Sequence, residues 1–304
     1  MRAGMARPAP ATLASAAPVL ATIAGIALYS AMDAVMKGAA LAVGAYSAYL
    51  LRCLIGAALT GPVWWASTRR FPRGRVLRIH LVRGVVGAFM GWSFFAAITR
   101  LPLAEAIAIS FIAPLIALYL AAAVLGETVR PRAVWGAVLG FAGVLVIVGG
   151  RIGRGAFDGE SLIGIALILG SAVLFAGNLI LQRQQALVAP PLEASAFGNG
   201  TVTLILLVGA PVLLEMPQGR GLWITLLLAA LLAIGAAMLL TWAYARSETQ
   251  RLVPIEYTGF LWASLLGWLM FAEPLGPATL VGTVLIVAGC LIATRQGRTE
   301  QTAV

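Results

Sequence analysis

Charged residues are scarce in this chain. Asp, Glu, Lys and Arg make up 11% of its 304 residues, and hydrophobic residues make up 61%. A soluble domain usually carries about 25% charged residues. The polar side chains are too few to cover a water-soluble globule of this length, so the composition excludes that class. It indicates an integral membrane protein.

Residues typical of catalytic and metal sites are also few. The chain has one histidine and two cysteines, and both Cys53 and Cys290 lie inside apolar runs, as small buried residues do. His80 closes a basic stretch and is expected to be solvated or interfacial. The sequence shows no nucleotide-binding loop, metal motif or nucleophile–base cluster. We therefore predict no catalytic residue, no metal, no cofactor and no enzyme, which also disfavours a membrane enzyme acting on lipid.

The net charge of +10 is placed in a way that argues against nucleic acid. Most Lys and Arg residues lie in the short gaps between apolar runs, which is the distribution of a membrane protein. A span needs about 20 apolar residues. Ten runs satisfy this: 17–37, 44–66, 79–99, 103–125, 132–150, 161–182, 194–214, 222–245, 252–271 and 275–294.

The second half of the chain repeats the first. A shift of 146 residues aligns Pro131 with Pro277, Gly136 with Gly282 and Gly143 with Gly289. The predicted division is a first five-helix repeat at 1–150, a link at 151–160, a second repeat at 161–295 and a tail at 296–304. Paired repeats in a membrane chain are typical of transporters.

The distribution of basic residues predicts the orientation. With the N-terminus in the cytoplasm, fourteen Lys and Arg residues fall inside and five outside. Both termini are then cytoplasmic, and the first apolar run is expected to remain as a span and not to be cleaved as a signal. Because each half has five spans, an odd number, the second half must enter from the opposite side. The predicted fold is all-α, with ten transmembrane helices in two inverted repeats.

Charges inside the spans carry the functional prediction, because burying one costs roughly 3 kcal/mol. Lys37, Arg52, Arg83 and Glu105 are assigned to gating or to structural ion pairs. Polar groups at related depths come from Asp33 and Asn178, and from Ser110 and Glu256. Aromatic side chains complete the candidate substrate-binding set, which is Asp33, Trp92, Phe95, Ser110, Asn178, Trp242, Glu256 and Tyr257.

Small residues and prolines mark the expected helix contacts. Gly84, Gly87 and Gly91 share one face of the third span, and glycines of the fifth and tenth spans suggest a scaffold or a dimer face. Pro62 and Pro211 occupy related positions and are expected to bend their helices.

The chain resembles the EamA-type transporters of the drug/metabolite transporter superfamily. The resemblance rests on Ala31–Lys37, Leu51–Arg52, Pro102–Ala106, Ala113–Leu115, Gly126–Glu127, Gly136, Gly140–Leu145, Ala272–Glu273, Gly282 and Ala288–Gly289. It implies a cavity lined by spans one, three, four, six, eight and nine, with spans five and ten at the periphery. It also implies gradient-driven transport of amino acids and related metabolites.

These observations together predict a secondary active transporter of a small polar or zwitterionic, amino-acid-like metabolite, located in the plasma (inner) membrane. It would work in the direction of export, by alternating access around a midplane cavity. Its partners would be the solute and the lipid bilayer, with protons as an open alternative for the coupling ion. A monomer and a homodimer both fit. Two further functions stay open: an uptake carrier for riboflavin or S-adenosylmethionine, and a passive channel or structural membrane subunit.

Overall fold

The computed structural model describes residues 16–113, 116, 131–153, 158–247, 252, 255–256 and 258–294, and within these the secondary structure is helical, without strands. The helices are α1 (Ala17–Val43), α2 (Ala45–Thr68), α3 (Arg75–Ile98), α4 (Leu103–Ser110), α6 (Pro131–Gly153), α7 (Gly159–Val188), α8 (Pro191–Leu207), α9 (Ala210–Leu213), α10 (Arg220–Arg246), α12 (Gly259–Phe271) and α13 (Pro277–Thr294).

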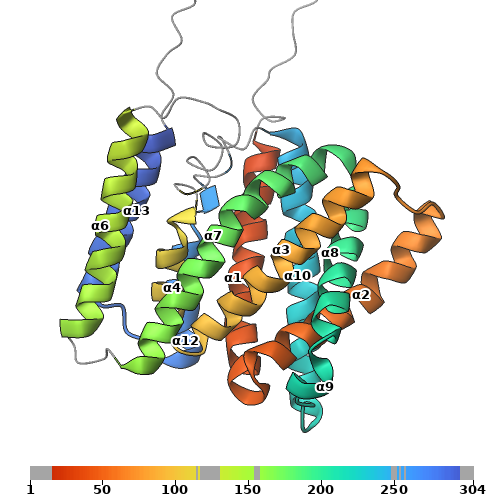
Figure 1. The fold of residues 1–304 in the computed structure, drawn as a ribbon, viewed down its shortest axis with the longest axis horizontal. Coiled ribbons are helices and arrows are strands. Elements are labelled where there is room, and N and C mark those ends of the chain that lie inside the picture. The colour runs from red at the N-terminus through yellow and green to blue at the C-terminus, as the bar shows by residue number, and fades with distance from the viewer. Residues whose placement is uncertain are drawn as a thin grey trace, which may run out of the picture.

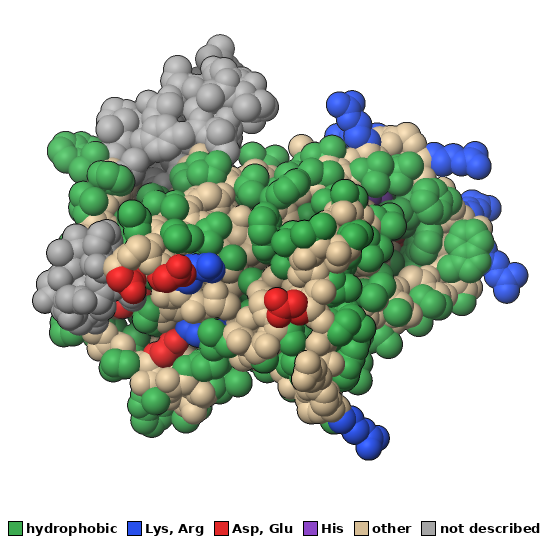
Figure 2. All heavy atoms as spheres, turned by 60° about the horizontal axis from the view of Figure 1, so that its bottom comes forward, with side chains coloured by type: hydrophobic (Ala, Val, Ile, Leu, Met, Phe, Trp, Pro, Cys, Tyr) green, Lys and Arg blue, Asp and Glu red, His purple; other side chains and the backbone are tan. Residues whose placement is uncertain are grey.

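The helices have the length and surface of membrane spans. Among the described residues, α1, α2, α3, α7 and α10 are long and apolar enough to cross a bilayer, and shorter apolar helices lie within α6, α12 and α13. Large hydrophobic side chains such as Val212, Leu204 and Trp135 are more than half exposed. Hydrophobic side chains cover much of the face seen in Figure 2; several Lys and Arg side chains lie at its margins, and others lie within it beside acidic side chains. Such a surface is matched to lipid and not to water.

Each of the ten predicted spans contains at least one described helix. In two of them, 103–125 and 194–214, the described residues do not form one continuous helix over the whole span. The predicted span 194–214 is divided into α8 and α9, because the helix breaks just before Pro211, whose ring cannot continue the backbone ladder. By contrast, α2 runs unbroken through Pro62. The helix α4 ends at Ser110, and Pro114 of the same predicted span lies outside the described residues.

Helices from the two halves pack in symmetric pairs. The contact of α1 with α10 has its counterpart in the contact of α7 with α3, since α1 corresponds to α7 and α10 to α3. The pairs α2 with α8, α4 with α12, and α6 with α13 each join a helix to its own repeat partner. In Figure 1, α6 and α13 stand together at one edge of the bundle, as predicted for the fifth and tenth spans.

The glycine faces of α6 and α13 show that these partners run antiparallel. A Cβ added at Gly289 would lie 2.5 Å from the Gly136 carbonyl oxygen, and one added at Gly282 would lie 2.6 Å from the Gly143 carbonyl oxygen. Contacts therefore move down one helix as they move up the other, and the shift of 146 converts one contact into the other. The repeats are inverted, and these glycines pack within the chain.

Side-chain bonds at the helix ends follow the same shift. Arg100 Nη1 donates to the Ala96 carbonyl at 2.8 Å, and its counterpart Arg246 Nη1 donates to the Trp242 carbonyl at 3.2 Å. In the same way, Lys37 Nζ donates to the Leu101 carbonyl at 2.8 Å, and Arg183 Nη1 donates to the Ser247 carbonyl at 2.9 Å. The last pair matches Lys37 with Arg183, as the shift of 146 requires.

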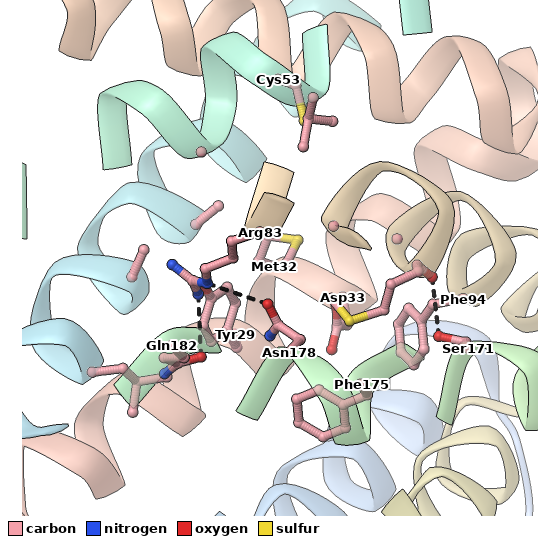
Figure 3. A pocket seen from close by; sticks show the side chains of 18 of the residues that line it. Tyr29, Met32, Asp33, Cys53, Arg83, Phe94, Ser171, Phe175, Asn178 and Gln182 are labelled. Atoms are coloured by element: carbon pink, nitrogen blue, oxygen red, sulfur yellow. Dashed lines mark hydrogen bonds between the residues drawn. The ribbon is translucent and has the colours of Figure 1, made fainter. Parts of the chain in front are cut away.

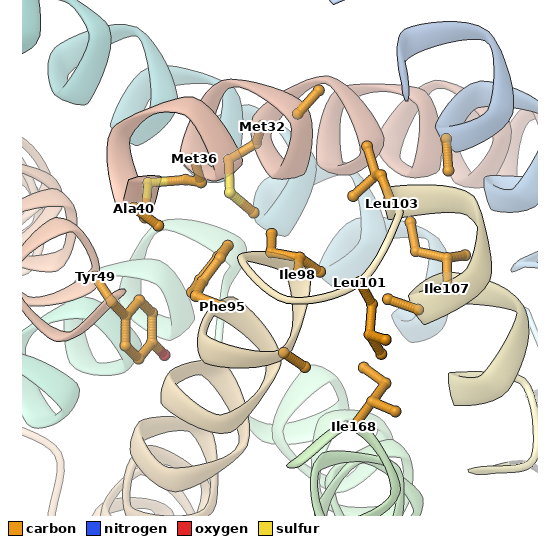
Figure 4. Packing of buried hydrophobic residues seen from close by; sticks show 14 of the residues in the cluster. Met32, Met36, Ala40, Tyr49, Phe95, Ile98, Leu101, Leu103, Ile107 and Ile168 are labelled. Carbon is orange, nitrogen blue, oxygen red and sulfur yellow. The ribbon is translucent and has the colours of Figure 1, made fainter. Parts of the chain in front are cut away.

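A hydrophobic cluster fills the bundle near the end of α3. Met36, Ile98 and Leu103 are fully buried there, and Figure 4 shows them with neighbours from α1, α2, α4 and α7. The turn between α1 and α2 is the single residue Gly44, whose φ of +76° lies in the region that favours glycine. This tight turn holds α1 and α2 side by side around the cluster.

Candidate functional site

A cavity of about 320 Å³ lies between the two halves. Its lining comes from α1, α2, α3, α4, α7, α8 and α10, with Glu256 and Gly259 at the start of α12. The six spans implied by the resemblance all contribute. The second and seventh spans, which were not expected, add Tyr49, Arg52 and Asn199. The volume falls in the range of small-molecule pockets, about 300–1,000 Å³.

Close packing of α3 brings the walls of the cavity together. Gly84 of α3 faces Thr201 of α8, and Gly91 faces Tyr49 of α2, so closely that an added Cβ would clash with either neighbour. Tyr49 in turn donates a hydrogen bond to the Gly87 carbonyl at 2.8 Å. The glycine face predicted for the third span therefore serves helix contacts and exposes backbone to the cavity.

Arg83 crosses from α3 to the polar face of α7. Its guanidinium donates to Asn178 Oδ1 and Gln182 Oε1, both at 3.2 Å, and to Gln185 Oε1. Figure 3 shows Arg83 directed toward Asn178 and Gln182. Three neutral amides, spaced four and three residues apart on one helix face, thus share one charge without a carboxylate.

His80 extends this set of bonds to α8, and the prediction that it is solvated or interfacial is wrong. The ring is fully buried. It lies 2.6 Å from Gln185 Nε2 and 3.1 Å from Glu193 Oε1, and it stacks on Phe197. We call Arg83, His80, Asn178, Gln182, Gln185 and Glu193 the His80 network. It joins α3, α7 and α8 near the start of α3, and Arg83, His80, Asn178, Gln182 and Gln185 line the cavity there.

Two acids face the cavity. Glu256 accepts a hydrogen bond from Tyr244 of α10. Asp33 of α1 lines the cavity and, among the described residues, forms neither a hydrogen bond nor a salt bridge. Its carboxylate therefore remains available to a bound solute.

Arg52 of α2 also lines the cavity and is only 8% exposed. Its Nη2 donates to Cys53 Sγ at 3.0 Å, and its guanidinium lies 5.1 Å from the Tyr49 ring centroid. Its Nε is buried without an acceptor in the described part of the chain. The three salt bridges found there do not include Arg52.

A buried ion pair lies near the opposite end of α3, beside the hydrophobic cluster. Lys37 Nζ bonds to Glu273 Oε1, and Glu273 Oε2 accepts the Leu103 N–H at 2.8 Å, which is an otherwise unpaired donor of the first turn of α4. Lys37 also donates to the Leu101 carbonyl. We call Lys37, Leu101, Leu103 and Glu273 the Glu273 lock. It joins α1, α4 and the end of α12.

The candidate residues divide between the cavity and its surroundings. Asp33, Arg52, Arg83, Phe95, Ser110, Asn178 and Glu256 line it. Trp92 lies outside the lining and meets Tyr46 edge-on, and Trp242 packs under Arg246. Glu105 accepts a hydrogen bond from Thr279, away from the cavity. Tyr257 lies outside the described residues.

Several lining residues were not predicted. Gln185 was missed because the sixth span was expected to end at 182, whereas α7 continues to Val188. The spacing of Asn178, Gln182 and Gln185 on one helical face was the available signal. Tyr29 and Asn199 gave no such signal, since their positions depend on how α1 and α8 rotate against their neighbours.

The comparison with protein families agrees with this architecture. The model of the EamA-like transporter family matches the chain twice, at residues 16–149 and 162–295. The chain belongs to the EamA-like transporter family. A crystal structure that is 23% identical superposes with a TM-score of 0.63, covering 91% of this chain and 96% of the other, which shows the shared fold.

Characterised relatives are exporters. The chain is 27% identical to the pseudopaline exporter CntI of Pseudomonas aeruginosa over 281 residues, which are 91% of this chain and 95% of the relative. It is 31% identical to the aromatic amino acid exporter YddG of Ancylobacter novellus over 225 residues, which are 71% of this chain and 76% of that protein. The protein is therefore a multi-pass membrane transporter of the drug/metabolite exporter type.

Proposed function

We propose that the protein exports a small, amino-acid-like metabolite across the plasma (inner) membrane by alternating access, with both termini in the cytoplasm. The observation that carries this proposal is the cavity between two inverted halves, which contains Asp33, Arg52 and Glu256. A charged cavity inside lipid-facing helices is costly unless a function requires it.

The arrangement of bonds at the two ends supports alternating access. The Glu273 lock and the His80 network lie at opposite ends of α3 and join different helices. Breaking one set while keeping the other would open one end of the cavity at a time. Because the repeats are inverted, related helix pairs occur at both ends, which provides two related packings, although the residues that form the bonds differ.

The lining supports an amino-acid-like solute. Opposite charges at Asp33 and Arg52 suit an ammonium and a carboxylate, and Phe94, Phe95 and Phe175 offer apolar contact. The two named relatives are a pseudopaline exporter and an aromatic amino acid exporter, which supports export as the direction of transport.

Counterflow in proteoliposomes tests this function. Purified protein would be reconstituted with each of the proteinogenic amino acids inside the vesicles, and entry of the same radiolabelled amino acid would be followed. At least one should give saturable uptake that is stimulated by the internal solute. Flux that rises linearly with concentration would instead identify a pore.

Two variants connect this activity to the cavity. Asp33→Asn and Glu256→Gln keep the shape of each side chain and remove its charge, so both should lower counterflow. Arg100→Gln is the matched control, since Arg100 forms an exposed salt bridge with Glu160 outside the cavity. Full activity in both cavity variants would remove these acids from the site.

A further inference from the structure

Among the described residues that line the cavity, Arg52 is a cation without an oxygen acceptor. The other cations predicted within the spans have several oxygen acceptors: Lys37 has Glu273 and the Leu101 carbonyl, and Arg83 has three amides of α7. Arg52 has only the weak acceptor Cys53 Sγ and the face of Tyr49. A guanidinium offers five donors in a planar fork, so most of these donors find no acceptor in the described part of the chain.

This state is expensive without a ligand. A buried charge that is neither paired nor fully hydrogen-bonded is strongly destabilising. The exposed fraction of Arg52 is only 8%, and its Nε has no acceptor among the described residues. A structural arginine would be expected to meet a carboxylate or a set of carbonyls, as Arg83 meets its amides.

Asp33 is the only described carboxylate of the cavity without a hydrogen-bond partner, and it forms no salt bridge with Arg52. Asp33 and Arg52 thus line the same cavity without pairing with each other. A solute that carries an ammonium and a carboxylate would satisfy both at once. A solute with one charge would leave the other group unpaired.

We propose that Arg52 binds the free carboxylate of the transported solute, while Asp33 receives its ammonium group. This inference rests on the proposed function and specifies the solute as an α-amino acid or a derivative that keeps its carboxylate. Arg52 is then a binding residue of the cavity, in contrast to Arg83, which joins α3 to α7. Planar bidentate recognition of a carboxylate is what the guanidinium favours.

Matched ligand pairs test the proposal. Each proteinogenic L-amino acid would be compared with its carboxamide, and L-phenylalanine also with 3-phenylpropionate, which lacks the ammonium. The readout is the apparent dissociation constant from ligand-dependent shifts in thermal unfolding of the purified protein. The unmodified protein should bind at least one acid about 10- to 100-fold more tightly than its amide, as expected for a charge-assisted bond.

Arg52→Gln should abolish the preference for acid over amide, and Arg52→Lys, which keeps the charge without the fork, should retain part of it. Arg52→Lys also supplies the readout if Arg52→Gln does not fold. Asp33→Asn should reduce the preference for L-phenylalanine over 3-phenylpropionate and keep the preference for acid over amide. Arg100→Gln should bind every ligand as the unmodified protein does.

The outcomes separate the two proposals. If acids bind but Arg52→Gln, or failing that Arg52→Lys, keeps the full preference for acid over amide, the role of Arg52 is refuted and the transport function stands. If acids and amides bind the unmodified protein equally, the carboxylate requirement is refuted. If no amino acid binds, the amino-acid-like solute is wrong, and the assignment of Arg52 falls with it.

Discussion

The Glu273 lock should control access to one end of the cavity. Glu273 serves two groups at once, since it pairs with Lys37 and accepts the Leu103 N–H. Ala272 before it has a φ of +52°, and this left-handed end of α12 turns Glu273 toward α1 and α4. Replacing Glu273 by Gln keeps an oxygen for the Leu103 N–H and removes only the ion pair.

The size of the effect follows from burial. The Lys37 side chain is 6% exposed and that of Glu273 is 17% exposed. Removing one partner of a fully buried pair costs about 3–5 kcal/mol, and the partial exposure of Glu273 lowers the expected cost for this pair to about 2–3 kcal/mol. If that energy holds the lock closed, the closed form loses roughly 30- to 150-fold in relative population.

Cysteine accessibility measures this shift. In a chain with Cys53→Ala and Cys290→Ala, Ile107→Cys places a thiol on α4, where Ile107 lines the cavity and is 7% exposed. A membrane-impermeant methanethiosulfonate reagent would be added on the side of the Leu101 turn. Glu273→Gln should raise the labelling rate by one to two orders of magnitude.

Two comparisons make the result specific. Arg100→Gln breaks an exposed salt bridge near the same turn, and such pairs contribute about 0–1 kcal/mol, so labelling should not change. Lys37→Gln together with Glu273→Gln leaves no unpaired charge and should label more slowly than Glu273→Gln alone. An unchanged rate in folded Glu273→Gln, or an equal rise in Arg100→Gln, would refute the gating role.

Three further variants test the opposite end, the scaffold and the turn after α12. Glu193→Gln removes the acid beside His80 at 3.1 Å, so it should raise labelling of a cavity cysteine from the opposite side of the membrane, and no change there would contradict closure by the His80 network. Gly282→Ala would push a methyl group against the Gly143 carbonyl and should cost about 1–3 kcal/mol in thermal unfolding, whereas Gly149→Ala, with open space around it, should cost nothing measurable. Ala272→Gly should raise the unfolding midpoint by the equivalent of about 1 kcal/mol, because glycine adopts positive φ without steric cost, and a fall in the midpoint would contradict this.

The fold was predictable because its signals are local and repeated. Apolar runs of span length locate the helices, and the odd number of spans in each half dictates inversion. Close packing of the fifth and tenth spans was indicated by Gly136 and Gly143 and by their repeat counterparts Gly282 and Gly289. The structure confirms this packing within the chain. The break before Pro211 had a local cause, yet the similar Pro62 leaves α2 intact. The surrounding packing decides which proline interrupts a helix.

The site was less predictable because it depends on helix rotation. Asp33 and Asn178 could be paired through the repeat alignment, and both line the cavity. His80 adjoins a basic stretch in sequence, and nothing local indicates that Glu193 and Gln185 would bury it. The sequence does not reveal which face of a span meets lipid. It therefore could not show that Trp92 and Trp242 lie outside the lining. Charged groups inside a span therefore identified the cavity better than aromatic residues did.

The symmetry of the scaffold and the asymmetry of the lining suggest different roles for the two halves. Three of the charged lining groups come from the first half: Asp33, Arg52 and Arg83. The facing helices α7 and α8 contribute mainly amides, as at Gln182 and Asn199. Helix pairing needs only shape, so both repeats can retain it while their polar residues diverge. A solute with distinct charged ends needs an asymmetric set of partners, and the first repeat supplies Asp33, Arg52 and Arg83 while the second supplies the amides and Glu256, which meets that need without disturbing the inverted packing.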